Sequence, residues 1–571
     1  MDIKQQRSPE VSLISRFRKN LESLRSERDK SWLPHWRELN QYIEPKAGKF
    51  LTTDKNNGSK KDQKIYNGRA RLALRTLTSG MMSGTTSPSR PWFNLRVGSG
   101  EGLQSINVRK WLDSVEEAIY SSFARSNLYT ELPKLYKSMA LYGIGAMMAL
   151  EDFEDVTRYY TFSVGEFFVA NDERLKVGTF AREYQLSVEQ VVEEFGWENC
   201  SYDVKNKYNQ NLLYEQVDIV HMIQRNDDRD EGKKDSKNMK YRSVHFEKKS
   251  NKGLSKKDLF LSESGFKRFP VFCPRWEVES TDDYGTGPGW DALADVKQLQ
   301  VEQKRKLQSI DRMANPPVVA PTTMIGKNTS TLPGGVTYSD ERDSGKGVRP
   351  LYQVDPRISE LMHDIKETES RINETFFADL FLALVKTDRR EITAREIDEI
   401  DSEKLLALGP VMERLNDELL DDLVTMQFER LLEGDMLPEP PPELEGETVK
   451  IEYISTLHQA QRSGGLSSID KLISFAGAVS QAKPEIMDKI NGDKAIDKYS
   501  EYLGTPASLL NSNEDIEKIR ASRAEAQQAE KQGQASLVAS QIGKNLAGAS
   551  MEKDNVLKQV ASQFAQQQNQ G

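Results

Sequence analysis

The segment Gly285-Thr-Gly-Pro-Gly289 is the part of this sequence most similar to a phosphate-binding loop. Closely spaced glycines before a helix let backbone N–H groups approach an anion at the helix N-terminus. The spacing differs from Gly-x-Gly-x-x-Gly, and no strand with a matching acidic residue follows the helix. A tight turn into a helix, with Pro288 near its first turn, therefore explains these glycines better. A nucleotide-binding enzyme that uses this segment is the less favoured alternative.

Other patterns that support catalysis or metal binding are absent from the sequence. It contains no Gly-x-x-x-x-Gly-Lys-Ser/Thr, His-Glu-x-x-His, Gly-x-Ser-x-Gly or Cys-x-x-Cys motif. The five histidines are scattered without the spacing of metal ligands. The only two cysteines, Cys200 and Cys273, exclude a disulfide framework and favour a reducing compartment. The sequence therefore predicts a protein that is not an enzyme and that needs no cofactor or metal.

A group of acidic side chains alternates with leucines in the second half of the chain: Asp417, Glu418, Asp421 and Asp422. Two carboxylates that act as acid and base need a sheltered site that separates their pKa values. Nothing in the flanking sequence indicates such shelter. We therefore expect these acids to form the solvated face of a helix.

A short charged link, residues 384–392, carries the cations Lys386, Arg389 and Arg390. Cationic side chains neutralise phosphates without reading base sequence, so these three residues are candidates for contact with DNA in a channel. A solvated loop explains the same residues, and the local sequence slightly favours that interpretation. An arginine-rich helix expected over residues 67–82 raises a similar choice, between phosphate contacts and salt bridges to another subunit.

Two long helical segments flank this link. The first is expected over residues 357–383, and the second opens with Thr393-Ala-Arg-Glu396, whose ends can form a capping box. Leucines and methionines then recur mostly at three- and four-residue steps, as in an amphipathic helix. Gly409-Pro410 interrupts this pattern. Because Pro410 has no N–H and its ring collides with the preceding turn, the helix must kink or restart there.

The first half of the chain mixes predicted helices and strands, which indicates an α+β fold that is mainly helical. A helix is expected from Ser8 to about residue 43, with a kink or break at Pro34. The densely charged residues 227–258 are expected to form a solvated hairpin or loop. A helix is also expected over residues 187–195. Short strands are expected at residues 143–150, 159–162, 177–184, 217–224, 269–277 and 449–455.

Composition limits the class of protein further. The 571 residues are 37% hydrophobic and 29% charged, and no stretch is long and apolar enough for a transmembrane helix. The net charge of −9 is unevenly distributed. Residues 1–110 carry 22 basic and 10 acidic side chains, whereas residues 393–447 carry 4 and 17. Such separation predicts one surface that meets polyanions and another that repels them.

The order of these parts resembles the portal, or head-to-tail connector, proteins of podovirus-type tailed bacteriophages. The resemblance rests on the segments Arg90-Pro-Trp-Phe-Asn-Leu95, Tyr284-Gly-Thr-Gly-Pro-Gly289, Asn315-Pro-Pro317, Thr393-Ala-Arg-Glu-Ile397 and Val449-Lys-Ile-Glu-Tyr-Ile-Ser455. Together these segments extend the resemblance over most of residues 12–510.

The resemblance implies a portal-type fold of wing, stem, clip and helical crown that assembles as a ring. It implies the following division: N-terminal helices and α+β wing, 1–289; first stem helix, 290–314; clip, 315–356; second stem helix, 357–383; tunnel loop, 384–392; kinked helix and return strand of the wing, 393–455; helical crown, 456–510; and Gln/Ala-rich C-terminal tail or barrel, 511–571.

The function implied by this resemblance is non-enzymatic. The subunits would form a ring, usually a dodecamer, at one capsid vertex, joining head to tail and conducting double-stranded DNA during packaging and ejection. The implied partners are the terminase motor, a tail adaptor, and capsid and scaffolding proteins, with no membrane. The protein would belong to the virion's portal vertex, and to the host cytoplasm during assembly. A virion structural adaptor without a DNA channel is the alternative.

Overall fold

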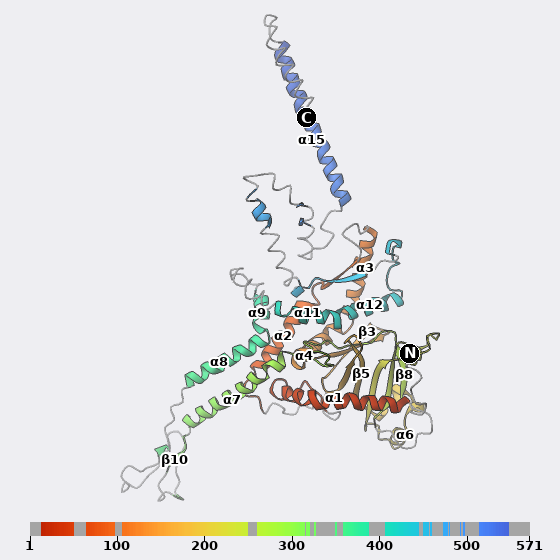
Figure 1. Ribbon diagram of the computed structural model, residues 1–571, viewed down its shortest axis with the longest axis vertical. Helices are drawn as coiled ribbons and strands as arrows, with labels where there is room; N and C mark the ends of the chain where they lie inside the picture. Colours follow the sequence, from red (N-terminus) through yellow and green to blue (C-terminus); the bar gives the residue numbers. More distant parts are fainter. Residues whose placement is uncertain are drawn as a thin grey trace. The chain divides into compact units, whose positions relative to one another are not determined.

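A computed structural model of the chain describes residues 13–50, 64–97, 106–233, 235–248, 260–314, 316–319, 325–326, 349–350, 358–386, 406–444, 449–455, 457–458, 472–477, 479, 491–492, 495–496 and 513–547 (Figure 1). The chain divides into two compact units, Met1–Lys471 and Leu472–Gly571. The first unit contains all of the described strands, and the second contains the 35-residue helix α15 (Asn513–Ala547). Helices and strands together confirm the predicted α+β class.

Four helices open the described part of the first unit: α1 (Leu13–Tyr42), α2 (Arg69–Thr85), α3 (Ile106–Arg125) and α4 (Leu128–Tyr142). α1 is continuous through Pro34, so the break that the sequence allows at this proline does not occur. The residues around Pro34 explain this, because Leu33, Trp36 and Leu39 are buried in the main core and hold the helix on both sides of the proline.

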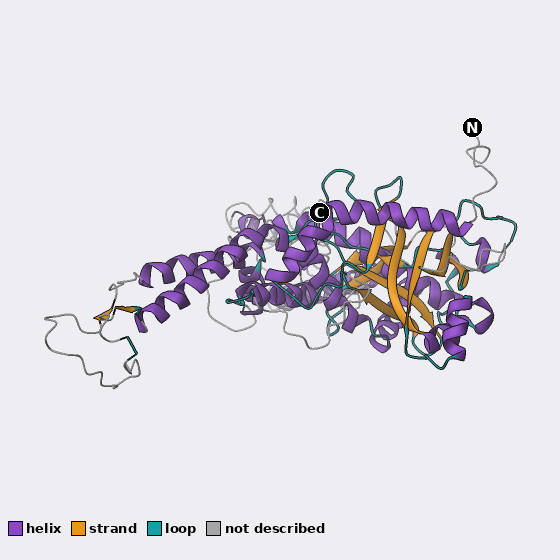
Figure 2. Ribbon diagram, turned by 90° about the horizontal axis from the view of Figure 1, so that it is seen from below, coloured by secondary structure: helices purple, strands orange, loops and turns teal. Residues whose placement is uncertain are grey.

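The larger sheet has five antiparallel strands in the order β4-β5-β6-β7-β8. Their bounds are β4 (Phe167–Asn171), β5 (Val177–Ser187), β6 (Gln216–Arg225), β7 (Tyr241–Glu247) and β8 (Ser262–Phe266). The first half of α1 covers one face of this sheet, where Phe17 packs among sheet side chains such as Phe168 and Val220 (Figure 2). The opposite face packs against α5 (Val188–Phe195) and α6 (Tyr202–Asn209).

A solvated hairpin or loop is expected over residues 227–258, and the strand β7, which pairs antiparallel with β6 and β8, agrees with a hairpin. The expectation that this segment is solvated is wrong for β7. Its central side chains Ser243, Val244 and Phe246 are buried between the two covering layers. The charged residues around β7 hid the short alternating pattern, since charge density over the whole window outweighed seven residues of strand.

Two smaller sheets lie beside the five-stranded sheet in the first unit. β2 (Ala146–Asp152) lies between β3 (Val156–Phe162) and the two-residue edge strand β9 (Val271–Phe272). β1 (Phe93–Val97) pairs with β12 (Val449–Tyr453), which brings together residues more than 350 positions apart in sequence. The strand predicted over residues 449–455 is therefore present, and its partner is β1 rather than the five-stranded sheet.

A helical hairpin projects from this body (Figures 1 and 2). Its helices are α7 (Pro288–Ala314) and α8 (Ile358–Thr375), which pack side by side. The two-residue strands β10 (Val318–Val319) and β11 (Arg349–Pro350) pair beyond their ends. α7 begins two residues before the predicted helix, whereas the single helix predicted over residues 357–383 is wrong. It divides into α8 and α9 (Ala378–Lys386) at Phe377, which has φ of 52°.

The break between α8 and α9 follows from packing. Phe376 is fully buried, and the ring of Phe381 lies where a side chain on Gly80 of α2 would be. A straight helix would not direct both phenylalanines into the same core. α9 is followed, after residues outside the described part, by α11 (Gly409–Leu415), the π-helical turn η5 (Asn416–Leu420) and α12 (Asp421–Glu433).

Candidate functional site

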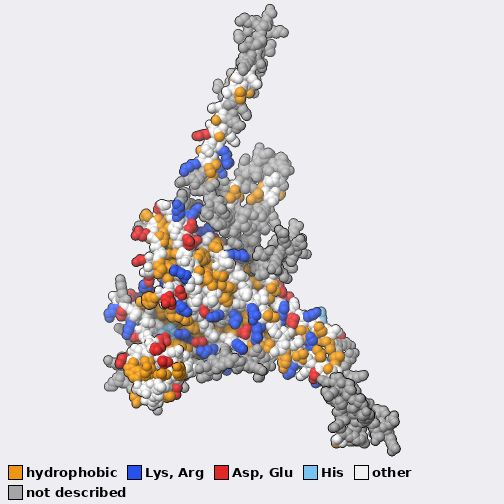
Figure 3. Space-filling model, turned by 180° about the vertical axis from the view of Figure 1, so that it is seen from behind, with side chains coloured by type: hydrophobic (Ala, Val, Ile, Leu, Met, Phe, Trp, Pro, Cys, Tyr) orange, Lys and Arg blue, Asp and Glu red, His pale blue; other side chains and the backbone are white. Residues whose placement is uncertain are grey.

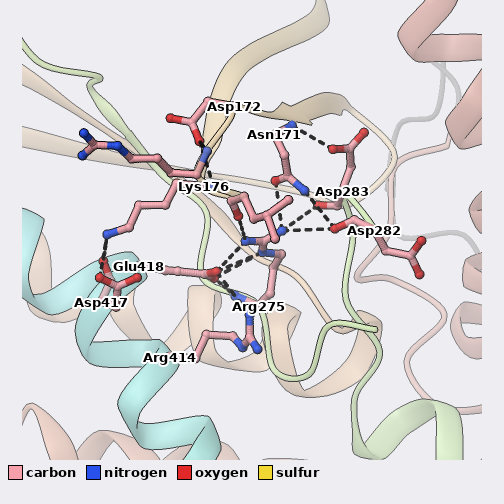
Figure 4. A network of polar contacts seen from close by, with 11 residues as sticks. Asn171, Asp172, Lys176, Arg275, Asp282, Asp283, Arg414, Asp417 and Glu418 are labelled. Atoms are coloured by element: carbon pink, nitrogen blue, oxygen red, sulfur yellow. Dashed lines mark hydrogen bonds and ion pairs between the residues drawn. The ribbon is translucent and has the colours of Figure 1, made fainter. Parts of the chain in front are cut away.

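Arg275 is the centre of a buried polar network in the first unit (Figure 4). It follows β9 and is 1% exposed, although its neighbours Cys273 and Trp276 belong to the apolar core. Its Nη2 donates to Oε1 of Glu418 at 2.6 Å and to the carbonyl of Leu175 at 2.8 Å. Its Nη1 donates to Oδ1 of Asn171 at 3.0 Å. One guanidinium thus links a helix to the turn between β4 and β5.

The same guanidinium also reaches the segment that leads into α7. Its Nη1 donates to the carbonyl of Asp282 at 3.2 Å, and Asn171 anchors the same segment by donating its backbone N–H to Oδ1 of Asp283 at 2.7 Å. Leu175, whose carbonyl accepts from Arg275, has φ of 58°, a left-handed conformation that is unfavourable for leucine. The hydrogen bond from Arg275 helps hold this turn in its strained shape.

Glu418 supplies the negative charge that this buried arginine requires. Its side chain is 9% exposed, and its Oε2 accepts the backbone N–H of Arg275 at 2.9 Å. Arg414 lies one turn earlier, with 3.6 Å between its Nη1 and Oε1 of Glu418. Because both charges are hydrogen-bonded and paired, the arrangement avoids the several kcal/mol that an isolated buried charge costs. We call Arg275, Glu418 and the loops at 171–176 and 282–283 the joint.

The π-helical turn brings Glu418 inward. One extra residue in a helical turn rotates the following side chains relative to the preceding ones. Leu415, Leu419 and Leu420 are all buried, so the turn keeps its apolar side packed while Glu418 bonds to Arg275. Single π-helical turns are frequent at functional positions. This turn directly follows α11, the helix that contains Pro410.

The expectation that these acids form one solvated face is wrong for Glu418, and each of the other three also has a partner. Asp417 accepts from Nζ of Lys176 at 2.6 Å, in a pair that is largely exposed. Asp421 accepts from the hydroxyl of Tyr453 in β12, and burial raises the pKa of that carboxyl. Asp422 lies 3.9 Å from Nη1 of Arg268. The acids therefore connect this helix to the surrounding strands and loops.

The joint is suited to holding elements together rather than to chemistry. The guanidinium of Arg275 and the carboxylate of Glu418 already bond to protein groups, which leaves little capacity to bind a ligand. Within the described ranges no cluster of three or more His, Cys, Asp or Glu side chains is arranged to hold a metal ion. None of the described helices has the length and apolarity needed to cross a bilayer.

The structure describes only part of the predicted channel residues. Lys386 is the last residue of α9, without a described side chain, and Arg389 and Arg390 lie outside the described residues. Their contact with DNA stays a prediction. Gly409 is the first residue of α11, and Pro410 lies in its first turn. The N–H groups of a first turn make no hydrogen bond within the helix, so a proline there breaks none. Motion about these two residues is likewise a prediction.

The glycines of residues 285–289 pack against the end of α4. A side chain on Gly289 would lie 2.3 Å from the carbonyl of Leu141, and one on Gly287 would lie 3.0 Å from the carbonyl of Met139. Thr286 pairs through its backbone with Glu277. The space in front of these glycines is thus occupied by α4, which supports the tight turn over the phosphate-binding alternative.

A second buried polar feature lies across the middle of the larger sheet. His221 of β6 and His245 of β7 are directly opposite, with ring centroids 3.9 Å apart and nearly parallel planes. The Nδ1 atoms of both rings are buried without a hydrogen-bond partner, and Arg182 is the next residue across the sheet. Burial and the nearby positive charge lower the pKa of His245 to about 3, and burial with the adjacent ring lowers that of His221 well below its usual value.

Reasoning from sequence missed Arg275 as the key residue of the joint. A signal was available, because a single arginine stands in the apolar run from Val271 to Trp276. A charged residue in such a run requires a buried counter-charge. The sequence does not show that the counter-charge is Glu418, 143 residues further on.

Comparison with known proteins shows what the whole chain is similar to. The family model described as bacteriophage head to tail connecting protein matches residues 15–510. A portal protein of Salmonella phage epsilon15 is 41% identical over 551 residues, covering 96% of this chain and 98% of that protein. A probable portal protein of Bordetella phage BPP-1 is 38% identical over 542 residues, covering 95% and 97%.

Similarity to solved structures is weaker. A chain from the virion of a native gene transfer agent particle aligns with 82% of this chain and 99% of its own length at 11% identity. The TM-score of 0.36 is too low to establish a shared fold.

Proposed function

The chain belongs to the bacteriophage head-to-tail connecting protein family. We propose which part of the chain forms the ring interface, the clip, the tunnel loop and the crown of such a connector. The resemblance inferred from sequence motifs is confirmed, and the connector joins head to tail at a capsid vertex. DNA enters and leaves the head through the same vertex during packaging and ejection. The role is structural, in agreement with the tightly packed glycines of residues 285–289.

We infer that the subunits form a closed ring in which the helical hairpin of one copy packs against that of the next. The observation that carries this proposal is the opposite charge of α8 and of the part of α7 that begins at Lys297. From Lys297 to Ala314, α7 has five basic and two acidic residues, whereas α8 has five acidic and two basic residues. Exposed residues include Arg305 and Arg312 on α7 and Glu360 and Glu367 on α8. A head-to-tail contact between such faces generates a ring when its rotation closes.

Apolar side chains support the same interface. Leu307, Ile310 and Met313 are each more than 40% exposed and recur every three residues, so they form a stripe on α7. The space-filling view shows hydrophobic and basic side chains side by side on the projecting hairpin (Figure 3). An apolar stripe within a field of complementary charge is suited to association with a second copy. Twelve subunits is the number that the family resemblance favours.

The remaining finer assignments follow the same proposal. α7 and α8 would be the stem, residues 315–356 the clip that meets the terminase motor and the tail adaptor, and the region around the larger sheet the wing. Residues 384–392 would be the tunnel loop, with Lys386, Arg389 and Arg390 facing DNA. The joint would fasten the helix behind that loop to the wing, so that the loop works from a fixed base. Residues 456–510 would form the crown.

The test is negative-stain electron microscopy of the purified full-length protein. End-on class averages should show closed rings with a central channel. Arg305→Glu with Arg312→Glu should abolish the rings, and the charge-swapped chain that also carries Glu360→Lys and Glu367→Lys should recover them in part. A chain that stays monomeric, alone and with its capsid, would overturn the ring and favour an adaptor without a channel.

A separate test concerns the tunnel loop and the helix start behind it. Arg389→Glu with Arg390→Glu, and Pro410→Ala on its own, should leave rings intact but reduce the DNA packaged per head. Loss of rings in the Pro410→Ala protein would make this proline a structural residue rather than part of a moving helix.

A further inference from the structure

A group of large side chains is exposed at the end of the wing around α6. They are Trp197 at 36%, Tyr202 at 76%, Tyr208 at 38%, Leu212 at 40% and Tyr214 at 84% exposed. Single exposed apolar residues are ordinary, but five within 18 consecutive residues form a cluster. In the space-filling view, hydrophobic side chains gather at this end of the molecule, lower left (Figure 3). We call these five residues the aromatic patch.

The backbone beneath the aromatic patch is firmly fixed, so the exposure does not reflect loose packing. Ser201 caps α6, and both its N–H and its hydroxyl donate to Glu247 of β7, at 3.0 and 2.7 Å. Cys200 and Val204 point into the core under α5. The rings of Trp197 and Tyr208 contact each other edge to face at 5.5 Å. Rigid tyrosine and tryptophan side chains lose little entropy on binding and are common at protein interfaces.

The charge around the aromatic patch selects the kind of partner. Residues 188–215 carry six acidic and two basic side chains. Both cations already interact within the patch region, since Lys205 lies over the ring of Trp197 and Lys207 pairs with Asp203 and Glu215. The rim is therefore a net acidic surface that attracts a basic partner and repels DNA and other acidic surfaces.

The aromatic patch lies at the opposite end of the first unit from the α7–α8 hairpin (Figures 1 and 2). A ring built through that hairpin leaves the patch uncovered, so the patch is available to a different protein. We propose that the aromatic patch docks the connector onto the capsid shell, by binding a segment of the shell protein that carries basic and apolar side chains. This inference rests on the proposed connector role and adds the surface that performs the attachment.

The experiment uses rings of the full-length protein and purified shell protein of the same phage as the probe. Tyr202→Asp combined with Tyr214→Asp removes two anchors whose side chains are mostly in water, so the fold should be unaffected. Phe153→Asp is the control, because Phe153 is a fully exposed aromatic residue that lies in the β2–β3 turn instead. We expect wild-type and control rings to bind the shell protein, and the double variant to bind at least about tenfold more weakly.

Charge provides the second measurement. Asp203→Lys with Glu215→Lys should weaken binding to a similar degree, and salt near 1 M should weaken wild-type binding because the Debye length falls to about 3 Å. Equal binding by wild-type and patch variants would overturn the proposal, as would wild-type rings that do not bind shell protein. Patch variants that fail to form rings would assign the patch to a second copy instead. Wild-type protein that forms no rings would contradict the proposed function itself.

Discussion

The joint and the α7–α8 hairpin use charged residues in opposite ways. In the joint, Arg275 and Glu418 are buried and bond to each other and to nearby backbone. On the hairpin, Arg305 and Arg312 are exposed to solvent. Charges that are satisfied inside one chain fix its shape, whereas charges left on a surface are available to another molecule. The comparison suggests that the wing is built to keep its form and that the hairpin is built to assemble.

The largest effect is expected on removing the cation of the joint. Arg275→Met leaves buried Glu418 with only Arg414, at 3.6 Å, as a counter-charge, which should destabilise the subunit by about 3–5 kcal/mol. Denaturant unfolding followed by circular dichroism measures this change. Lys176→Met is the matched control, because its pair with Asp417 is exposed and should contribute at most about 1 kcal/mol. Equal losses in both variants would remove the distinction between the joint and the surface pairs.

The next effect concerns the place where the wing meets the hairpin. Gly143 ends α4 with φ of 88°, and a Cβ there would lie 2.0 Å from the carbonyl of Gly285. Gly143→Ala should destabilise the subunit by about 2–4 kcal/mol, because left-handed backbone strain adds to overpacking. Gly409→Ala is the control, since nothing lies within 4 Å of its added Cβ. Thermal unfolding compares the two, and a harmless Gly143→Ala would show that this contact yields easily.

Acid should weaken the sheet of the wing before it weakens the hairpin. His221 and His245 have lowered pKa values when folded, with His245 at about 3 against 6.5 when unfolded. The unfolded chain therefore binds more protons below pH 6.5, and stability present above that pH is lost as the pH falls. Each histidine should contribute a loss of about 1.4 kcal/mol per pH unit below its unfolded pKa.

Unfolding curves between pH 7 and pH 4 test this expectation. His221→Phe with His245→Phe should flatten the pH dependence, because two phenylalanines can occupy the same cross-strand positions without titrating. His363→Gln, at an exposed position on α8, should leave the dependence unchanged. An unchanged slope in the double variant would assign the acid sensitivity to other groups.

Local signals in the sequence predict much of the fold and little of the joint. The glycine-proline turn before the helix identifies α7, and the strands expected at residues 177–184 and 217–224 lie within β5 and β6. The break at Phe377 was missed because it depends on the core around Gly80, which is distant in sequence. Glu418 was expected in solvent because the acids alternate with leucines, and its buried partner Arg275 is 143 residues away in sequence. Pairing of remote residues and helix irregularities are thus the information that local patterns lack.

The smallest effect on subunit stability is expected where the largest effect on assembly is proposed. Arg305 and Arg312 are exposed on α7, so Arg305→Glu with Arg312→Glu should change the free energy of unfolding by no more than about 0.5 kcal/mol. Unfolding of unassembled subunits, with sedimentation to measure ring content, separates the two quantities. Little loss of stability together with loss of rings would place these charges between copies. A loss of 2 kcal/mol or more would instead make them part of the fold of one subunit, because exposed charges contribute that much only when they are held by neighbours in the same chain.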